Sequence, residues 1–412
     1  MSLHNRYHAV VVGAGLVGAA AALALSRAGL RVALIEPRLP PAHNDARAGL
    51  DNAGRDARAE FDDAGWDARM YAINPGNADF LDGLGAWQKL DTARIQAVYR
   101  MEVAGDAGGH LRMDAYEAGV PRLATILESG NLQGALWKAV REQAMVDLFC
   151  PASVVSIEWG TPHSTLMLED GTAIQAELVV GADGIQSGIR EMAGIQAHFS
   201  PYQQSGVVAN FVTEKPHSGT AHQWFRSDFS PGDVVAFLPL PGNRMSLVWS
   251  TATAHAQELM SLDVDAFCRQ VQAAGHAQLG QMKLITPPAA FPLRLMQPVS
   301  TVAPGCVLVG DAAHGVHPLA GQGVNLGFGD VAALVQVLSQ RGRANCGELT
   351  LLMRYARRRA EPVARMQWVT DKLWRLFEMQ APLASMTRNT GMSVLNSLGP
   401  LKSALVHEAL FT

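Results

Sequence analysis

Short apolar runs separated by glycine-rich turns open the chain. Residues 8–12 (HAVVV) are typical of a buried parallel strand, and residues 16–28 are small and apolar, as in a helix packed on a sheet. A second strand is expected over residues 31–35, and it ends at Glu36. This order of strand, helix and strand predicts an α/β unit at the start of the chain.

Strand patterns dominate the middle of the chain. Alternating runs between about residues 150 and 182, with a turn at Asp170, predict β-hairpins that return to the first sheet. From about 200 to 295, the runs GVVANFV, VVAFLPL and RMSLVWS predict an antiparallel sheet. A helical stretch near 263–274 and a proline-rich passage over 287–298 close this part, which we expect to be a second, inserted domain.

Helical patterns fill the rest of the chain, the clearest over residues 331–338, 348–379 and 382–398. Residues 37–67 are rich in Ala, Asp, Arg and Gly and have no apolar periodicity. They are expected to form a surface loop that is longer than most connections.

Composition narrows the classes of function. Of the 412 residues, 48% are hydrophobic and 17% are charged, which is enough for a large core in two subdomains. The formal net charge of -4 gives no global attraction to nucleic acid or anionic lipid. The four cysteines lack metal-site spacing, and no signal peptide or membrane span is indicated. We therefore expect a cytoplasmic protein that binds neither nucleic acid nor metal.

The turn after the first strand has the pattern of a dinucleotide site. Residues 13–18 (GAGLVG) follow a strand and open a helix, and Glu36 ends the next strand. In this pattern Gly13 permits the tight turn, Gly15 lets backbone N–H groups reach a pyrophosphate, and Gly18 brings helix and strand close. The helix N-terminus favours the anion, and Glu36 can accept hydrogen bonds from ribose hydroxyls. The combination favours dinucleotide binding over a purely structural glycine cluster.

Two later segments add candidate ligands. Residues 178–190 (LVVGADGIQSGIR) and residues 309–314 (VGDAAH) each place an aspartate after an apolar strand, and residues 318–327 (PLAGQGVNLG) follow the second. A strand-Gly-Asp arrangement offers a carboxylate to ribityl hydroxyls. Gly321 to Gly323 offer N–H groups at a helix start, where the helix dipole can stabilise negative charge on a reduced flavin ring.

These three segments resemble the three fingerprints of the class A flavoprotein monooxygenases, the group that includes p-hydroxybenzoate hydroxylase. The resemblance extends over nearly the whole chain. It implies non-covalent FAD as cofactor and NAD(P)H as a transiently bound co-substrate, because no second GxGxxG is present. The residues that we assign to FAD on this basis are Gly13, Ala14, Gly15, Gly18, Glu36, Arg69, Gln133, Asp183, Gly184, Gly310, Asp311, Pro318, Gly321, Gln322, Gly323, Val324 and Asn325.

The fold class expected from the resemblance is α/β, a Rossmann-like FAD-binding domain with an inserted antiparallel-sheet substrate domain and a helical C-terminal region. We expect the FAD-binding domain to comprise residues 1–75, 126–195 and 296–345. The substrate domain would comprise residues 76–125 and 196–295, and the C-terminal helices residues 346–412.

Within the superfamily, the chain is more similar to the ubiquinone-biosynthesis hydroxylases. The matching segments are Asp67-Ala68-Arg69 before Tyr71-Ala72-Ile73, then Leu84-Gly85-Ala86-Trp87, Phe291-Pro292-Leu293, residues 317–323 (HPLAGQG), and Tyr355 with Arg357 and Arg359. The family pattern places the counterpart of Arg69 near the flavin. One position departs from it, because Ser129 follows Glu128 where the family usually has Asn. Ser129 can still cap a helix, but it lacks the Asn amide.

The resemblance implies that the protein hydroxylates an aromatic ring through a flavin C4a-hydroperoxide formed with O₂. The substrate expected is a polyprenylated phenol or benzoquinol intermediate of ubiquinone biosynthesis. Since the cofactor carries the chemistry, no catalytic side chain is assigned, and Pro318, Gly321, Gln322 and Gly323 are expected to border the flavin ring. Two alternatives stay open: a hydroxylase of a small soluble aromatic, and a non-catalytic FAD-holding subunit of a biosynthetic complex.

Two remaining features bear on partners. His314 and His317 could suggest a metal pair, but no carboxylate or cysteine lies at a supporting spacing. Arg354, Arg357, Arg358 and Arg359 are interpreted as a solvated helix face, with lipid headgroups or a protein partner as alternatives. Peripheral contact at the inner face of the membrane, a complex with other quinone-biosynthesis proteins, and the oligomeric state are left open.

Overall fold

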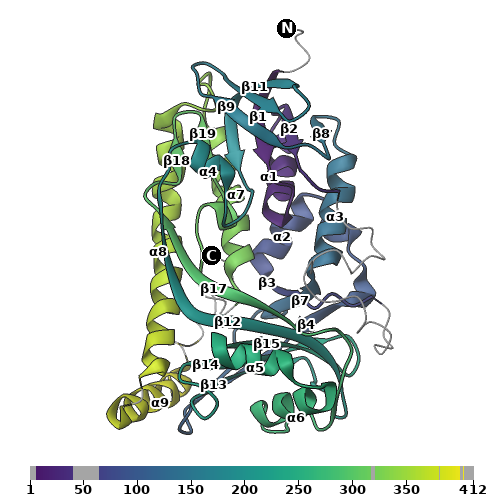
Figure 1. The fold of residues 1–412 in the computed structure, drawn as a ribbon, viewed down its shortest axis with the longest axis vertical. Coiled ribbons are helices and arrows are strands. Elements are labelled where there is room, and N and C mark those ends of the chain that lie inside the picture. The colour runs from purple at the N-terminus through teal and green to yellow at the C-terminus, as the bar shows by residue number, and fades with distance from the viewer. Residues whose placement is uncertain (1–5, 40–64, 317–320, 380, 400–401, 403–412) are drawn as a thin grey trace.

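The structure is a computed structural model that describes residues 6–39, 65–316, 321–379, 381–399 and 402 (Figure 1). Most of the loop expected over 37–67 lies outside the described residues, as do His317 and Pro318. The described residues form a mixed sheet at one end of the long axis, a mostly antiparallel sheet at the other, and a small sheet between them (Figure 1). The α/β fold class expected from the sequence is confirmed.

The first sheet is built around strand β1 (Arg6–Val12). It lies between β2 (Val32–Ile35) and β11 (Ala173–Gly181) and runs parallel to both. Parallel strands β8 (Val146–Phe149) and β19 (Cys306–Leu308) extend the sheet on either side. The antiparallel additions are β9 (Val154–Glu158), β10 (Ser164–Leu168) and β18 (Val302–Ala303), so the hairpin expected at Asp170 is present between β10 and β11.

Both faces of the first sheet are covered, as its continuously apolar strands require. Val11 and Leu34 point to one face and pack against α1 (Leu16–Arg27), α3 (Ser129–Arg141) and α7 (Gly323–Ser339). Val10 and Ile35 point to the other face and pack against β10 and the short helix α4 (Gly188–Met192). Because successive strand residues alternate between faces, each apolar run supplies two cores.

The second sheet has the order β16-β12-β15-β14-β13-β5-β6, with β17 paired to the far part of β12. It differs from the expectation in two places. The proline-rich passage forms a strand, β17, which tolerates proline because it pairs only with β12 among the described strands. An unpredicted helix, α5 (Thr253–Ser261), precedes α6 (Val264–Ala274). The strands are β5 (Arg100–Ala104), β6 (His110–Asp114), β12 (Ala197–Thr213), β13 (Thr220–Arg226), β14 (Asp233–Leu240), β15 (Arg244–Ala252), β16 (Met282–Leu284) and β17 (Ala289–Pro298).

The small sheet links the two larger ones. Its strands β3 (Met70–Ile73), β7 (Ala124–Glu128) and β4 (Ile95–Val98) pair antiparallel in that order. Helix α2 (Pro75–Gly83) follows β3, and short 3₁₀ turns lie at Trp87–Lys89, Thr92–Arg94 and Gly310–Ala312. Strand β4 continues almost directly into β5 of the second sheet. The domain boundaries expected from the sequence stay a prediction.

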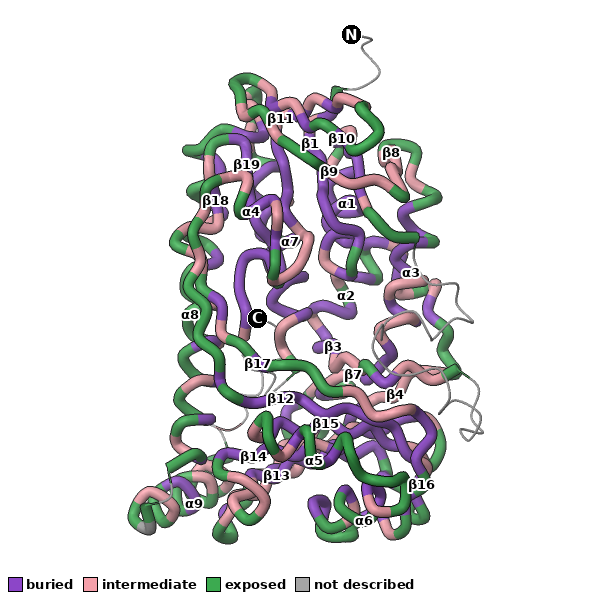
Figure 2. Tube along the Cα trace, in the orientation of Figure 1, coloured by how far each residue is buried: buried purple, intermediate pink, exposed green. Residues whose placement is uncertain are grey.

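Helix α8 (Leu349–Glu378) is a single 30-residue helix along one side of the molecule (Figure 1). Its first half packs on α7 through Tyr355, and its second half packs on the second sheet through Trp374 and Phe377. The face of α8 that points away from the protein is exposed (Figure 2). Helix α9 (Pro382–Ser397) then turns across the end of the second sheet and contacts β6.

Candidate functional site

The glycines in the turn between β1 and α1 are needed for different structural reasons. Gly13 has φ +95°, and a Cβ there would lie 2.5 Å from the carbonyl oxygen of Ala182. A Cβ at Gly18 would lie 1.8 Å from the carbonyl oxygen of Gly13. Gly15, by contrast, has open space where a Cβ would be and stands at the N-cap of α1. Gly13 and Gly18 are therefore needed by the fold, whereas Gly15 leaves room for a ligand at the helix N-terminus.

A cavity of about 430 Å³ lies beside this turn. Gly13, Gly15 and Glu36 line one side, and Asp183 and Gly184 line another. Two segments that the sequence indicated separately therefore face the same space. The arrangement offers backbone N–H groups together with carboxylates, which is the donor and acceptor set that a nucleotide needs.

Glu36 contacts the turn between β1 and α1 directly. Its Oε2 accepts a hydrogen bond from the N–H of Ala14 at 2.6 Å, and its Oε1 accepts one from Arg38 at 3.2 Å. The carbonyl of Ala14 is held from the other side, where Gln133 Nε2 donates at 2.5 Å and Trp137 Nε1 at 3.0 Å. Gln133 therefore acts through the backbone of the turn, with its side chain donating to Ala14.

Asp183 caps the segment that follows it. Its Oδ1 accepts from the Ser187 hydroxyl at 2.5 Å, and its Oδ2 accepts from the Ile189 N–H at 3.0 Å. Arg190, which is buried, donates to the carbonyls of Ile185 and Ala312. Through Arg190, this segment is tied to the one that contains Asp311.

The third segment reaches the first turn through contacts at glycines. Gly310 has φ +60°, and a Cβ there would lie 3.1 Å from the side chain of Val17 on α1. A Cβ at Gly327 on α7 would lie 2.5 Å from the same side chain. The absence of side chains at these two positions lets α7 and the Gly310 turn approach the N-terminus of α1, so all three sequence motifs converge.

Two aspartates, Asp311 in the third segment and Asp330 three residues beyond it on α7, differ sharply in environment. Asp311 is exposed, whereas Asp330 is fully buried. Asp330 accepts from the Gly310 N–H at 2.9 Å, from His314 Nε2 at 2.6 Å and from Arg359 Nε at 2.7 Å. Arg359 also donates to the carbonyl of Leu326 at 3.0 Å. Asp330 thus fixes the turn that presents Asp311.

Charge pairing dominates this buried network. Burial alone would raise the pKa of Asp330, but His314 and Arg359 outweigh it, and the pKa is lowered. Burial would likewise lower the pKa of His314, but the charge and hydrogen bond of Asp330 raise it. The expectation of a wholly solvated arginine run is wrong at Arg359, which is buried, while Arg354, Arg357 and Arg358 are exposed.

Residues at the start of α7 have mixed roles. Gly321 has φ +61°, and Gln322 is the N-cap of the helix. The side chain of Asn325 is committed to the protein: it donates to the carbonyl of Ala72 at 2.8 Å and accepts from Asn77 at 3.1 Å. Gly323 begins the helix and Val324 is buried. The first turn of α7 therefore presents mainly backbone N–H groups.

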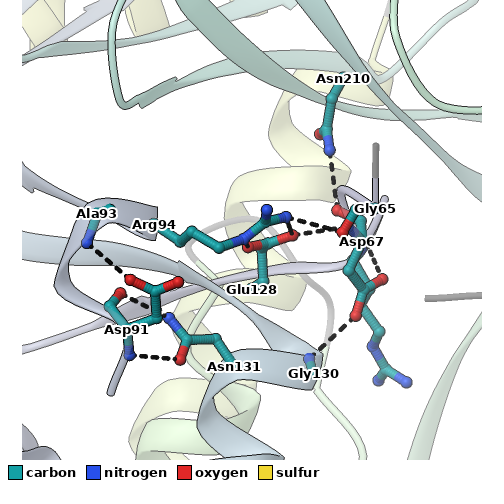
Figure 3. Close-up of polar contacts among 10 residues, drawn as sticks. Gly65, Asp67, Asp91, Ala93, Arg94, Glu128, Gly130, Asn131 and Asn210 are labelled. Carbon is teal, nitrogen blue, oxygen red and sulfur yellow. Dashed lines mark hydrogen bonds and ion pairs between the residues drawn. The ribbon is translucent and has the colours of Figure 1, made fainter. Parts of the chain in front are cut away.

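The loop that carries Arg69 is held at Asp67 (Figure 3). The Asp67 N–H donates to Glu128 Oε1 at 2.7 Å, and its carbonyl accepts from Asn210 Nδ2 at 2.8 Å. Its carboxylate accepts from the N–H groups of Arg69 at 2.9 Å and Gly130 at 3.1 Å. Asp67 thus joins the small sheet, α3 and strand β12 at one point, and burial raises the pKa of its carboxyl.

Glu128 is the buried anchor of this loop. Its carboxylate accepts from Arg94 Nε at 2.5 Å and from Arg94 Nη2 at 2.6 Å, a two-point pair that is mostly shielded from water (Figure 3). Sequence reasoning missed this pair, because Arg94 lies 34 residues before Glu128 and belongs to no motif that was identified. The nearby Ser129 does not cap α3, where Glu128 holds the N-cap position; its N–H donates to the Arg69 carbonyl at 2.9 Å.

Arg69 and Asp311 lie close enough to interact electrostatically, although 242 residues separate them in the chain. The Arg69 guanidinium lies 5.4 Å from the centre of the Tyr71 ring. Burial raises the pKa of Tyr71; the positive charge of Arg69 opposes this rise and the negative charge of Asp311 adds to it, so the phenol stays neutral. The Arg69 loop and the Asp311 turn therefore face one region between the first sheet and the small sheet.

Comparison with known proteins agrees with this geometry. A family model described as an FAD binding domain matches residues 6–369. The 3-demethoxyubiquinol 3-hydroxylase of Escherichia coli is 34% identical over 405 residues, which cover 97% of this chain and 97% of that protein. The mitochondrial ubiquinone biosynthesis monooxygenase COQ6 of Mus musculus is 31% identical and covers 97% and 90% of the two chains. The ubiquinone hydroxylase UbiL of Rhodospirillum rubrum is 31% identical, with 98% and 89% covered.

Solved structures share the fold. PqsL from Pseudomonas aeruginosa superimposes with a TM-score of 0.74 at 21% identity and covers 94% of this chain and 99% of its own. HpxO from Klebsiella pneumoniae, complexed with FAD, gives a TM-score of 0.69 at 16% identity, with 95% of each chain covered.

Fold and site define an FAD-binding protein of the α/β class. The chain belongs to the class A flavoprotein monooxygenases, within the family of ubiquinone-biosynthesis hydroxylases. It is an FAD-dependent aromatic-ring hydroxylase. The residues fit FAD, because the open space at Gly15, the cavity beside Glu36 and the exposed carboxylate of Asp311 supply room and polar groups where the nucleotide needs them.

Two kinds of feature are absent from the described residues. In that part of the chain, no group of three or more His, Cys, Asp or Glu side chains is arranged to hold a metal ion. His314 is instead bonded to Asp330. No helix in the described ranges combines the length and the apolar character needed to cross a bilayer.

Proposed function

We propose that this hydroxylase acts on a polyprenylated phenol or benzoquinol intermediate of ubiquinone biosynthesis, with NAD(P)H and O₂ as co-substrates. The observation that carries the proposal is the 34% identity, over 97% of both chains, with a protein named 3-demethoxyubiquinol 3-hydroxylase. That similarity spans the second sheet as well as the cofactor motifs. A relation limited to FAD binding would not require it.

We assign the ADP half of FAD to the first turn. The N–H groups around Gly15 and the N-terminus of α1 would hold the pyrophosphate, and Glu36 would accept from the ribose hydroxyls. Asp183 and Gly184 would shape the opposite wall of the cavity. This assignment is supported by the cavity that these residues share.

We assign the flavin half to the third segment and the Arg69 loop. Asp311 would bind the ribityl or pyrophosphate region, and the Gly310 turn, held by Asp330, would orient it. Backbone N–H groups of residues 321–325 would lie along the ring, and Pro318 is proposed at its border. Arg69 would place a positive charge beside Asp311. Bound FAD supplies the redox chemistry and oxygen activation, while the chain binds, orients and shields it.

Purified protein separates the proposed function from its two alternatives. NADH oxidation and oxygen incorporation are measured with a prenylated phenol, with the same phenol without its tail, and with no phenol. The proposal expects the tailed substrate to give the fastest coupled turnover. Faster turnover of the tail-free ring would favour a hydroxylase of a small aromatic. Flavin retention without stimulation by either ring would favour a non-catalytic subunit.

The ring position is identified in cells. Deleting the gene and extracting quinones is expected to reveal one accumulating prenylated intermediate that lacks a hydroxyl group. Complementation with the wild-type chain should remove it, and complementation with Gly15→Val, which fills the open space at the turn, should not. An unchanged quinone profile in the deletion strain would contradict the proposed pathway.

We also propose that the protein reaches its lipid-tailed substrate by peripheral contact with a membrane or by a complex with other quinone-biosynthesis proteins. The helical end of the chain supports this, because its exposed face contains both apolar and basic residues.

A further inference from the structure

Helix α9 packs with its polar side toward the rest of the protein. Arg388 and Asn389 are each only 5% exposed. Arg388 forms an ion pair with Asp106 and donates to the carbonyls of Leu376 and Met379. Asn389 accepts from the N–H of Gly109 at 2.8 Å and donates to Asp106 Oδ1 at 2.8 Å. Polar contacts therefore hold α9 against the loop between β5 and β6 and against the end of α8.

The opposite side of α9 is uncharged and open, and its exposed apolar residues alternate with Thr387, Thr390 and Ser397. Leu383 is 71% exposed, Met386 63%, Val394 51% and the C-cap residue Leu398 45%. At 3.6 residues per turn, these four side chains lie within roughly one third of the helix circumference, opposite Arg388 and Asn389. Arg388 is the only charged residue in α9, so the outward face carries no charge. A helix exposed to water normally has the reverse arrangement.

The neighbouring helix adds positive charge. Helix α8 contains seven basic and three acidic residues, and of the basic ones Arg359 is buried and paired with Asp330, whereas the whole chain has a formal net charge of -4. In the last turns of α8, the exposed residues include Trp368, which is 63% exposed, Lys372 and Leu373. Exposed tryptophan, leucine and lysine side chains on one helix are typical of the boundary between lipid headgroups and acyl chains.

We propose that the outward face of α9, together with the last turns of α8, docks on the surface of an anionic lipid bilayer. The inference rests on the proposed function, since a substrate with a polyprenyl tail resides in such a bilayer. A second copy of the chain fits this face less well, because a symmetric dimer would bring the basic helix α8 of each copy toward its like-charged counterpart. A bilayer accepts the exposed apolar residues and is attracted by the surrounding charge.

Flotation of the FAD-loaded full-length protein with vesicles tests the proposal without any substrate. Vesicles of phosphatidylcholine with phosphatidylglycerol are expected to carry the protein, and vesicles of phosphatidylcholine alone to carry much less. The double variant Leu383→Asp with Met386→Asp should lower partitioning by about tenfold or more, since both residues lose burial in lipid. The matched control is Val155→Asp, which alters an exposed valine on β9 in the other sheet and should partition like wild type.

A second arm tests charge. Lys372→Glu should lower partitioning roughly fivefold or more, whereas Lys138→Glu, the same change at an exposed position of α3, should not. Equal binding by the Leu383/Met386 variant and wild type would overturn the proposal, as would binding that ignores lipid charge. A dimer that forms without lipid and is dissociated by these substitutions would also overturn the proposal. Vesicle binding that is seen only after deletion of residues 403–412 would do the same. Vesicle binding and turnover of the tailed phenol are read separately, so either can fail without the other.

Discussion

The two halves of the cofactor site are built in opposite ways. The first turn works through its backbone: small residues let α1 approach β1, and N–H groups are left facing a cavity beside Gly15. The third segment works through side chains, because a buried aspartate, Asp330, organises the Gly310 turn through ion pairs with His314 and Arg359. The first half is therefore sensitive to changes in side-chain size, and the second is sensitive to changes in charge.

This difference separates residues that line a site from residues that hold it. Asp311 and Asp330 lie near each other in the sequence, yet Asp311 is exposed and Asp330 is buried among charged partners. Gln133 and Asn325, both assigned to FAD from the sequence, use their side chains to hold the protein: each donates to a backbone carbonyl, and Asn325 also accepts from Asn77. Removing a lining residue should weaken the cofactor, whereas removing a holding residue should weaken the fold.

The largest effect is expected for Asp330→Ala. The substitution leaves Arg359 and His314 buried without their carboxylate, which should lower the free energy of unfolding of the apoprotein by about 3–5 kcal/mol. Asp311→Ala is the matched control. It should change apoprotein stability by no more than about 0.5 kcal/mol while weakening FAD binding.

Urea denaturation of the apoproteins measures the first effect, and quenching of flavin fluorescence measures the second. If both aspartates changed stability equally, the distinction between lining and holding residues would be wrong for these two residues. If Asp311→Ala bound FAD like wild type, its proposed role toward the cofactor would be wrong.

The sequence predicted the first half of the site better than the second. Gly13, Gly15, Gly18 and Glu36 lie within a short stretch, so spacing alone shows that one strand-turn-helix-strand unit brings them together. Arg359 lies in a run of arginines, and nothing in the run tells which one turns inward. That choice depends on the position of Asp330, 29 residues earlier in the chain, and hence on how α7 packs on α8.

Long-range pairs and edge strands limited the fold prediction in the same way. The Arg94–Glu128 pair and the hydrogen bond from Asn210 to Asp67 join residues 34 and 143 positions apart, and no local pattern encodes either. Strand β17 was obscured by its prolines, which are tolerated only because the strand lies at an edge. The apolar period of the buried strands was sufficient to predict β1, β2 and the long strands of the second sheet.

A glycine pair in the first turn sharpens the contrast. Gly18→Ala places a Cβ 1.8 Å from the carbonyl oxygen of Gly13, so backbone must move, and the free energy of unfolding should fall by about 1–3 kcal/mol. Gly15→Ala meets nothing within 4 Å and should leave apoprotein stability nearly unchanged while lowering FAD affinity. Thermal unfolding and FAD titration of both variants check this. Equal stability losses would indicate that Gly15, too, is required by the fold.

Glu36→Ala tests the carboxylate that faces the turn. The substitution removes the acceptor for the Ala14 N–H and for the ribose hydroxyls assigned to it. FAD binding should weaken by about 1–3 kcal/mol, the range for an unmet polar group. Glu36→Gln keeps an oxygen acceptor and should lose less. Titration of the apoproteins with FAD gives the comparison, and an unchanged affinity in Glu36→Ala would count against the ribose role.

The smallest effect expected is a change in pH dependence at His314. Its pKa is raised in the folded protein because Asp330 outweighs the effect of burial, so His314 stabilises the fold below its ordinary pKa of 6.5, and this contribution is lost as the pH rises through the folded value. Asp330 acts in the opposite direction, since its lowered pKa gives a contribution that is lost only in acid. Wild type should therefore lose more stability than His314→Gln between about pH 6 and about pH 9. His110→Gln, at an exposed position on β6, is the control and should follow wild type. Parallel pH profiles for wild type and His314→Gln, measured as the midpoint of thermal unfolding of the apoproteins, would show that the imidazole is neutral in the folded state and that Arg359 alone balances Asp330.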